Sequence, residues 1–245
     1  LAAAAAERRP IPMLSAELPE LSVADAYEVQ AALVARQLER GDTRIGYKLG
    51  LVSRAKQEAM GVAAPLWGRL TDSMLLAEDV PLDTSALIHP RVEPEIAFLL
   101  GSDLPAVGAS VATVLAATAA VLPALEVLDS RYEEFRFTLP DVIADNASAA
   151  RIVLGGRSLD PAALDLQLEG MALRRDGTVV HTAAGAAIGG HPAAVVAWLA
   201  REVGGLEAGS VILSGGLTAP VELGPGTVVS AEFANLGTVT LGCGS

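Results

Sequence analysis

The sequence has few of the groups on which several classes of site depend. Cys243 is the single cysteine, which excludes an intramolecular disulfide and a zinc site built on cysteines. The three histidines (His89, His181 and His191) show no metal-ligand spacing, and no Ser-His-Asp arrangement can be argued from them. Lysine and arginine number 17 against 29 acidic residues, so the formal net charge is -12. Nucleic acids and anionic membranes bind clustered basic residues, so neither is an expected partner.

Long apolar segments are also missing. No run reaches the ~20 apolar residues that a membrane-spanning helix needs. Residues 1–6 are apolar, but this stretch is short and lacks the positively charged start of a signal peptide. The chain begins with Leu1, so we expect the natural start to lie upstream. These features predict a cytoplasmic protein, and the lone cysteine fits a reducing compartment.

What remains is a chain that can build a large core. Hydrophobic residues make up 51% of the 245 residues and charged residues 19%, which is typical of a folded globular protein. We predict an α+β fold with a mainly β core, divided into a helix-rich region over 1–75 and a β-rich core over 76–245 that together can form one compact unit. Helices are expected over 22–41, 54–60, 106–122 and 193–203. Strands are expected over 92–100, 121–129, 164–173, 178–182, 211–213, 227–233 and 238–241.

Two glutamates interrupt the apolar segment 92–100. Side chains two apart on a strand point to the same face, so Glu93 and Glu95 are expected to project together. Glu126 is likewise a lone acid in the apolar segment 122–128. Neighbouring buried carboxylates repel one another, and a divalent cation such as Mg²⁺ or Mn²⁺ would relieve that repulsion. The alternative is that these acids pair with nearby arginines or face solvent at a sheet edge.

Lys48 is flanked by glycines in the segment Gly46-Tyr47-Lys48-Leu49-Gly50. Glycine lets the backbone approach a ligand closely. A lysine in such an apolar segment can bind a carboxylate or, when it is desolvated, exchange a proton. The other interpretation is a surface lysine whose stem packs on apolar neighbours, and the spacing alone favours it.

Two loops could contribute to a site. Residues 141–148 are dense in polar side chains and precede the apolar stretch 152–154. A loop that lines a site and a plain structural turn explain this density equally well, because Asp and Asn also build turns. Residues 214–216 (Ser-Gly-Gly) could bind an anion through backbone N–H groups, although their spacing favours an ordinary loop.

Taken together and in order, the motifs of this chain resemble those of the fumarylacetoacetate hydrolase superfamily. The resemblance runs collinearly from about residue 22 to residue 241. More narrowly, it points to the hydratase and decarboxylase branch of catechol meta-cleavage pathways. The motifs are GYKLG (46–50), WGRLTD (67–72), HPRVEPEIAF (89–98), EVLDSRY (126–132), ADNAS (144–148), GHP (190–192) and SGG (214–216).

The resemblance implies a mixed, mainly β fold around a Mg²⁺ or Mn²⁺ ion held by Glu93, Glu95 and Glu126. It also implies a small 2-oxo acid as substrate, a homo-oligomer, and association with the partner hydratase or decarboxylase of the pathway.

Five further residues acquire roles from the same resemblance. Lys48 and Asp72 would be the catalytic side chains, with Asp72 near the reacting end of the substrate. Arg69, Leu70 and Ser148 would bind the substrate.

Segments 132–137 and 215–219 resemble the decarboxylases of this branch. The activity implied is loss of CO₂ from 2-oxohex-3-enedioate, a vinylogous β-keto acid, to give 2-hydroxypenta-2,4-dienoate. The alternative is a hydratase that acts on 2-hydroxypenta-2,4-dienoate. Hydrolysis of a C–C bond is a third activity, but no histidine matches the residue that would activate water. A metal-stabilised binding subunit without activity is the non-enzymatic alternative.

Overall fold

The computed structural model describes residues 1–244, and the side chains of all of these except Ala59 and Met60. The helices are α1 (Ala2–Glu7), α2 (Leu14–Glu17), α3 (Val23–Leu38), α4 (Arg54–Met60), α5 (Val111–Ala117), α6 (Leu139–Ala144) and α7 (Pro192–Val203). The strands are β1 (Arg44–Gly50), β2 (Leu66–Thr71), β3 (Arg91–Leu100), β4 (Leu104–Pro105), β5 (Thr118–Leu128), β6 (Ala149–Leu154), β7 (Gly170–Arg175), β8 (Thr178–Ala184), β9 (Gly205–Leu206), β10 (Val211–Leu213), β11 (Val221–Glu222), β12 (Val228–Phe233) and β13 (Gly237–Gly242).

The largest sheet has the order β2-β1-β10-β3-β5-β6, and β11 also pairs with β3. β10 and β11 both lie along β3, with Val211 opposite Leu99 and Val221 opposite Val92. The loop between them passes the middle of β3, where Leu217 N donates to Pro94 O at 3.0 Å. A loop rather than a strand therefore borders β3 at its centre, which opens this part of the sheet to a site.

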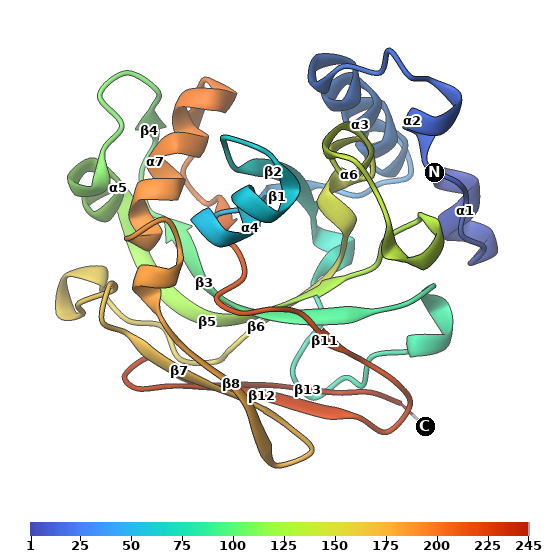
Figure 1. Cartoon of the computed structure of the whole chain (residues 1–245). Coiled ribbons are helices and arrows are strands. Elements are labelled where there is room, and N and C mark those ends of the chain that lie inside the picture. The colour runs from blue at the N-terminus through green and yellow to red at the C-terminus, as the bar shows by residue number, and fades with distance from the viewer. Residues whose placement is uncertain (245) are drawn as a thin grey trace.

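A four-stranded sheet in the order β13-β12-β7-β8 packs against β5 and β6, as Figure 1 shows at the bottom of the molecule. Alternate side chains of β3, such as Val92, Ile96 and Phe98, are fully buried in the core cluster shared by the two sheets. The residues between them point to the opposite face, because side chains alternate along a strand. Glu93 and Glu95 belong to that opposite face. The mainly β, α+β fold predicted from the sequence is confirmed.

The helices lie on the side of the large sheet that faces away from the four-stranded sheet (Figure 1). α3 packs against α6 beside the edge strand β2, and the buried amide of Gln30 joins them by donating to Trp67 O and Ile143 O at 3.0 and 2.9 Å. α3 begins at a capping box between Ser22 and Asp25 and lies within the helix predicted over 22–41. None of the helices within residues 1–244 has the length and apolar character needed to cross a bilayer.

Two predicted elements are wrong in extent. The predicted helix over 106–122 is only α5, because the chain enters β5 at Thr118 and pairs with β3 from there on. An unbroken apolar run does not distinguish a buried helix from a buried strand. The strand predicted over 164–173 starts at Gly170, because Asp165 turns the preceding segment by accepting from Gln167 N and Leu168 N.

The largely helical interpretation of the first 75 residues misses two strands. β1 and β2 pair antiparallel over residues 44–71, and β1 continues the sheet by pairing with β10. Glycines at both ends of the GYKLG motif concealed the strand from a propensity argument. The sheet thus holds strands from both sides of the predicted boundary at 75/76, and the division itself stays a prediction.

Candidate metal centre and substrate cavity

Three buried glutamates meet on the face of the large sheet that points away from the core. Glu93 lies opposite Glu126 in the register of β3 and β5, and Glu95 follows two residues further on the same face. Carboxylate oxygens from all three lie within 4.8 Å of one another. Glu95 and Glu126 are fully buried, and Glu93 is 7% exposed. Three carboxylates at this spacing can share one divalent cation.

The hydrogen bonding of these carboxylates also fits a cation. Among the described residues, Glu95 Oε1 and Glu126 Oε2 accept no hydrogen bond, and Glu126 Oε1 has the Lys48 ammonium as its partner. The other oxygen of Glu95 accepts from Gly215 N at 2.6 Å. Burial and the neighbouring Glu126 raise the pKa of Glu95 well above its usual range, and burial raises the pKa of Glu126. Buried carboxylate oxygens without a partner are strongly unfavourable unless a proton or a metal ion binds them, so the residues present fit a hard, oxygen-binding cation that replaces those protons.

Lys48 lies beside the triad on β1. Its ammonium is 2.8 Å from Glu126 Oε1 and donates to Ala147 O at 3.0 Å, with the residue 3% exposed. Gly68 is its cross-strand partner on β2, and a Cβ there would lie 2.7 Å from Asn146 O. This glycine lets the 146–148 turn approach β1 closely enough to contact Lys48.

The turn that contacts Lys48 has an unusual backbone. Asn146, Ala147 and Ser148 have φ values of 51°, 55° and 57°, so three consecutive residues other than glycine are left-handed. Such residues are strained and persist where the surroundings hold them. The Asn146 amide holds this turn by pairing with both Arg69 N and Arg69 O, at 2.8 and 2.9 Å. In the part of the chain that the structure describes, Ser148 Oγ is buried without a partner.

A second lysine approaches the triad from α4. Lys56 Nζ lies 2.7 Å from Glu93 Oε1, so the charged partners of the glutamates include two lysines. Gly216 also approaches Glu93, since a Cβ there would lie only 2.2 Å from Glu93 Oε2. Sequence reasoning missed Lys56, and for 214–216 it favoured an ordinary loop over an anion-binding loop. Gly215 and Gly216 follow the buried strand β10 closely, and this pair of glycines could have indicated that another group approaches the backbone there.

Replacing Gly216 by alanine is therefore expected to weaken metal binding. The added methyl group must displace the Glu93 carboxylate, so we expect Mg²⁺ affinity to fall by about tenfold or more. Gly224→Ala is the matched control, because the nearest atom to a Cβ there is Thr227 Oγ1 at 3.9 Å and neither glycine has a left-handed φ. Calorimetric Mg²⁺ titration of both variants measures the effect. Equal affinities would show that Gly216 does not shape the site.

A cavity of about 290 Å³ opens beside the triad. Lys48, Glu93 and Ser148 lie on its wall together with Lys56 and Arg91. The remaining wall is mostly apolar and consists of Gly50, Leu51, Leu66, Leu128, Phe135, Phe137, Val142, Ala147 and Pro220. The cavity therefore joins a cation site to an apolar chamber with several positive charges.

Three residues predicted from the resemblance lie elsewhere. Leu70 is fully buried on the same face of β2 as Gly68, in a small hydrophobic cluster with Ala97 and Ala124, rather than on the cavity wall. Arg69 points to the opposite face, where its guanidinium donates to Gln30 Oε1 at 2.6 Å. Asp72 is exposed beyond the end of β2 and accepts from Thr43, which lowers the pKa of its carboxyl. The structure does not bring these side chains to the cavity, and their roles stay predictions.

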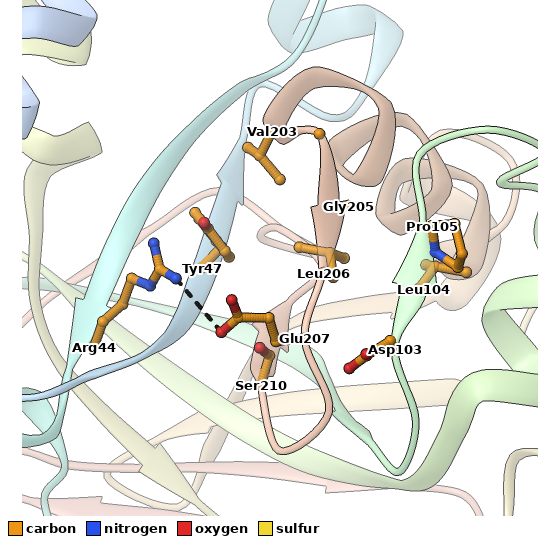
Figure 2. Close-up of a pocket in the computed structure, with 11 residues that line it drawn as sticks. Arg44, Tyr47, Asp103, Leu104, Pro105, Val203, Gly205, Leu206, Glu207 and Ser210 are labelled. Atoms are coloured by element: carbon orange, nitrogen blue, oxygen red, sulfur yellow. Dashed lines mark ion pairs between the residues drawn. The ribbon is translucent and has the colours of Figure 1, made fainter.

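A second cleft, of about 370 Å³, lies at the start of β1 (Figure 2). Arg44 and Glu207 face each other across it at 3.7 Å, and both side chains are exposed. An exposed ion pair of this kind contributes little to stability, because water solvates both charges. The buried glutamates are therefore the stronger candidate site.

The metal-free protein is expected to lose stability as the pH rises, while stabilisation by Mg²⁺ grows. Glu95 and Glu126 keep protons in the folded state at pH values where the unfolded chain, with pKa values near 4.5, has lost them. The folded state then binds more protons than the unfolded state, so the free energy of unfolding falls with increasing pH. Mg²⁺ competes with the same protons and binds better as they leave.

Thermal unfolding tests this pH dependence. The Tm is measured with EDTA and with excess Mg²⁺, in buffers from mildly acidic to mildly alkaline. Burial raises the pKa of Asp145 to about 6 even beside Arg131, which gives a pH effect of the same sign. Asp145 lies outside the triad, so its contribution cancels in the difference between the two curves. A Mg²⁺-induced shift in Tm that is the same at every pH would contradict the prediction.

Comparison with known proteins agrees with this geometry. Residues 56–241 match the family model described as "Fumarylacetoacetate (FAA) hydrolase C-terminal". The chain is 42% identical over 234 residues to 4-oxalocrotonate decarboxylase of Pseudomonas sp. (strain CF600), covering 94% of this chain and 89% of that protein. It is 38% identical over 229 residues to 2-hydroxyhexa-2,4-dienoate hydratase of Comamonas testosteroni, covering 91% and 87%.

A solved structure is similar over nearly the whole chain. 4-Oxalocrotonate decarboxylase from Pseudomonas putida G7, complexed with magnesium and adipate, superposes with a TM-score of 0.95 at 38% identity and covers 98% of this chain and 93% of its own. The family model, the relatives and the fold all agree with the resemblance seen in the motifs. The chain belongs to the fumarylacetoacetate hydrolase family.

Proposed function

We propose that the protein is a Mg²⁺-dependent lyase that decarboxylates 2-oxohex-3-enedioate (4-oxalocrotonate) to 2-hydroxypenta-2,4-dienoate. The observation that carries the proposal is the group of three buried glutamates, with unpaired oxygens, beside Lys48 at one end of a cavity. The similarity to 4-oxalocrotonate decarboxylases, one of them solved with magnesium, supports the choice of metal and substrate.

The reaction breaks the bond between C5 and the C6 carboxylate and releases CO₂. The electron pair of that bond passes through the conjugated chain to the 2-oxo oxygen, which takes up a proton to give the enol. When bound at the three glutamates, a divalent cation supplies Lewis-acid stabilisation of negative charge on a 2-oxo acid.

The chain's own residues supply the other requirements. Lys48 is a buried ammonium on the cavity wall, and its Nζ can hold or give the proton that the 2-oxygen needs. The apolar side chains Leu128, Phe135 and Phe137 line the space for the carbon chain and exclude water from it. Exclusion of water strengthens the electrostatic effect of Lys48 and disfavours addition of water to the product.

Hydration of 2-hydroxypenta-2,4-dienoate is the second candidate. Hydratases are among the relatives at comparable identity, and the unpaired Ser148 Oγ at the cavity offers a group that could orient a water molecule. Both activities would use the same glutamates and the same lysine.

The test is to supply 2-oxohex-3-enedioate with Mg²⁺ and to follow CO₂, and in parallel to supply 2-hydroxypenta-2,4-dienoate and follow loss of the diene. Release of CO₂ that stops on addition of EDTA supports the decarboxylase. Turnover of the diene with no CO₂ from the dicarboxylate would reverse the assignment in favour of the hydratase.

We also propose a homo-oligomer. β8 forms an edge of the four-stranded sheet, and its Val179 and Val180 are 42% and 39% exposed, a surface that another copy could cover. Native mass spectrometry checks the oligomeric state. Association with the partner enzyme of the pathway and a cytoplasmic location stay predictions from the sequence.

A further inference from the structure

The wall of the cavity beside the triad carries a third basic residue in addition to the two lysines. Lys48, Lys56 and Arg91 line it, although the chain as a whole has a net charge of -12. Lys48 and Lys56 each have a glutamate of the triad within 2.8 Å. Arg91 has a different environment, because its carboxylate partner, Glu222, does not belong to the triad.

Arg91 is held in place but only weakly paired. Its guanidinium stacks over the ring of Phe135, 4.2 Å from the ring centre. Within residues 1–244, its acidic partner is Glu222 at 3.4 Å, whose side chain is 75% exposed. An exposed ion pair at such a distance is weak, so Glu222 leaves the guanidinium open to another anion. Stacking on Phe135 fixes the orientation of its planar set of N–H donors.

The position of Arg91 along β3 sets its distance from the triad. Arg91 and Glu93 are two residues apart on one strand and therefore share a face, separated by about 6.6 Å along the strand. Opposite Arg91 in the sheet lies Leu128, which also lines the cavity. A short linear ligand that starts at the glutamates and runs along β3 therefore ends at the guanidinium.

We propose that Arg91 binds the distal carboxylate of the substrate and thereby selects 2-oxo dicarboxylates over 2-oxo monocarboxylates. This inference rests on the proposed function for the position of the 2-oxo acid end at the glutamates. It also explains segment 132–137, whose sequence resembles the decarboxylases: Phe135 from this segment fixes the guanidinium, and Phe137 lies beside it on the cavity wall.

Arg91 should act on binding rather than on the chemical step. Negative charge leaves the distal carboxylate as CO₂ forms, so a cation on that group stabilises the bound substrate at least as much as the transition state. Replacing Arg91 by methionine is therefore expected to raise KM for the dicarboxylate by about tenfold and to leave kcat unchanged or higher.

Binding of acids that cannot react separates this role from the reaction itself. We would titrate the Mg²⁺-loaded wild type, Arg91→Met and Arg136→Met with 2-oxoadipate and 2-oxohexanoate by calorimetry. Arg136 is the matched control, because its side chain is 78% exposed and paired with Glu134 on the same segment. Wild type and Arg136→Met should favour 2-oxoadipate, whereas Arg91→Met should bind it about tenfold more weakly and bind 2-oxohexanoate as wild type does.

Two outcomes would overturn the proposal: a wild type that binds both acids equally, and an Arg91→Met variant that weakens both acids alike or neither of them. The result is independent of the CO₂ assay, since neither acid is a vinylogous β-keto acid. If the protein releases no CO₂ and yet shows the Arg91-dependent preference, the reaction assignment fails and the binding assignment stands. If it releases CO₂ without that preference, the reaction assignment stands and the binding assignment fails.

Discussion

Replacing Glu95 by glutamine is expected to abolish Mg²⁺ binding and turnover while leaving the metal-free protein at least as stable as the wild type. Glu95 is fully buried next to Glu126, and its charged form is disfavoured by both burial and repulsion. Glutamine carries no charge to desolvate, and its amide oxygen can still accept from Gly215 N. The variant therefore removes a metal ligand without opening a cavity.

Thermal unfolding with and without Mg²⁺ measures this effect. At a Mg²⁺ concentration about 100 times its Kd, the wild type should gain about 2.7 kcal/mol, and Glu95→Gln should gain none. Glu232→Gln is the control, because Glu232 is a half-exposed glutamate on β12, paired with Arg174, and should leave the Mg²⁺ effect unchanged. A normal Mg²⁺-induced shift in Glu95→Gln would place the cation elsewhere, and a strongly destabilised variant would mean that Glu95 has a structural role.

The central part of the site could be predicted because it depends on the period of a strand. Glu93 and Glu95 had to share a face once 92–100 was assigned as a strand, and Glu126 was the lone acid of another apolar segment. The register that sets Glu93 opposite Glu126 joins segments more than thirty residues apart. No local pattern specifies such a pairing, so their convergence was a hypothesis until the sheet was known.

The same alternation explains why two residues that the motifs suggested do not line the cavity. Arg69 and Leu70 are neighbours in one motif, yet consecutive residues of β2 face opposite sides, and neither lines the cavity. A motif preserves the order of residues but does not say which of them face a ligand. Because β1 and β2 were not recognised as strands, this test could not be applied to them.

Lys56 and Arg91 were missed for another reason. Both are ordinary charged residues in their local sequence, one on a short helix and one at the first position of a strand. Their importance comes from distant partners, since Lys56 meets Glu93 and Arg91 stacks on Phe135. Long-range contacts of flexible side chains leave no periodic signal in a sequence.

Replacing Lys48 by methionine is expected to lower kcat by about 10²- to 10⁴-fold while Mg²⁺ binding is kept or strengthened. Lys48 is the buried ammonium beside Glu126, so its loss removes the group that can hold the proton for the 2-oxygen. The positive charge 2.8 Å from Glu126 Oε1 also opposes a cation bound there, so its removal favours Mg²⁺. Methionine is unbranched and fills much of the same space.

Steady-state kinetics and Mg²⁺ titration on the same samples separate the two effects. Lys56→Met is the matched control, because Lys56 also contacts a glutamate of the triad, at 2.7 Å, but from a half-buried position on α4. We expect this control to gain Mg²⁺ affinity as well and to keep most of its kcat. Equal losses of kcat in both variants would mean that the lysines act through net charge alone. A loss of Mg²⁺ binding in Lys48→Met would mean that Lys48 organises the glutamates and does not act on the substrate.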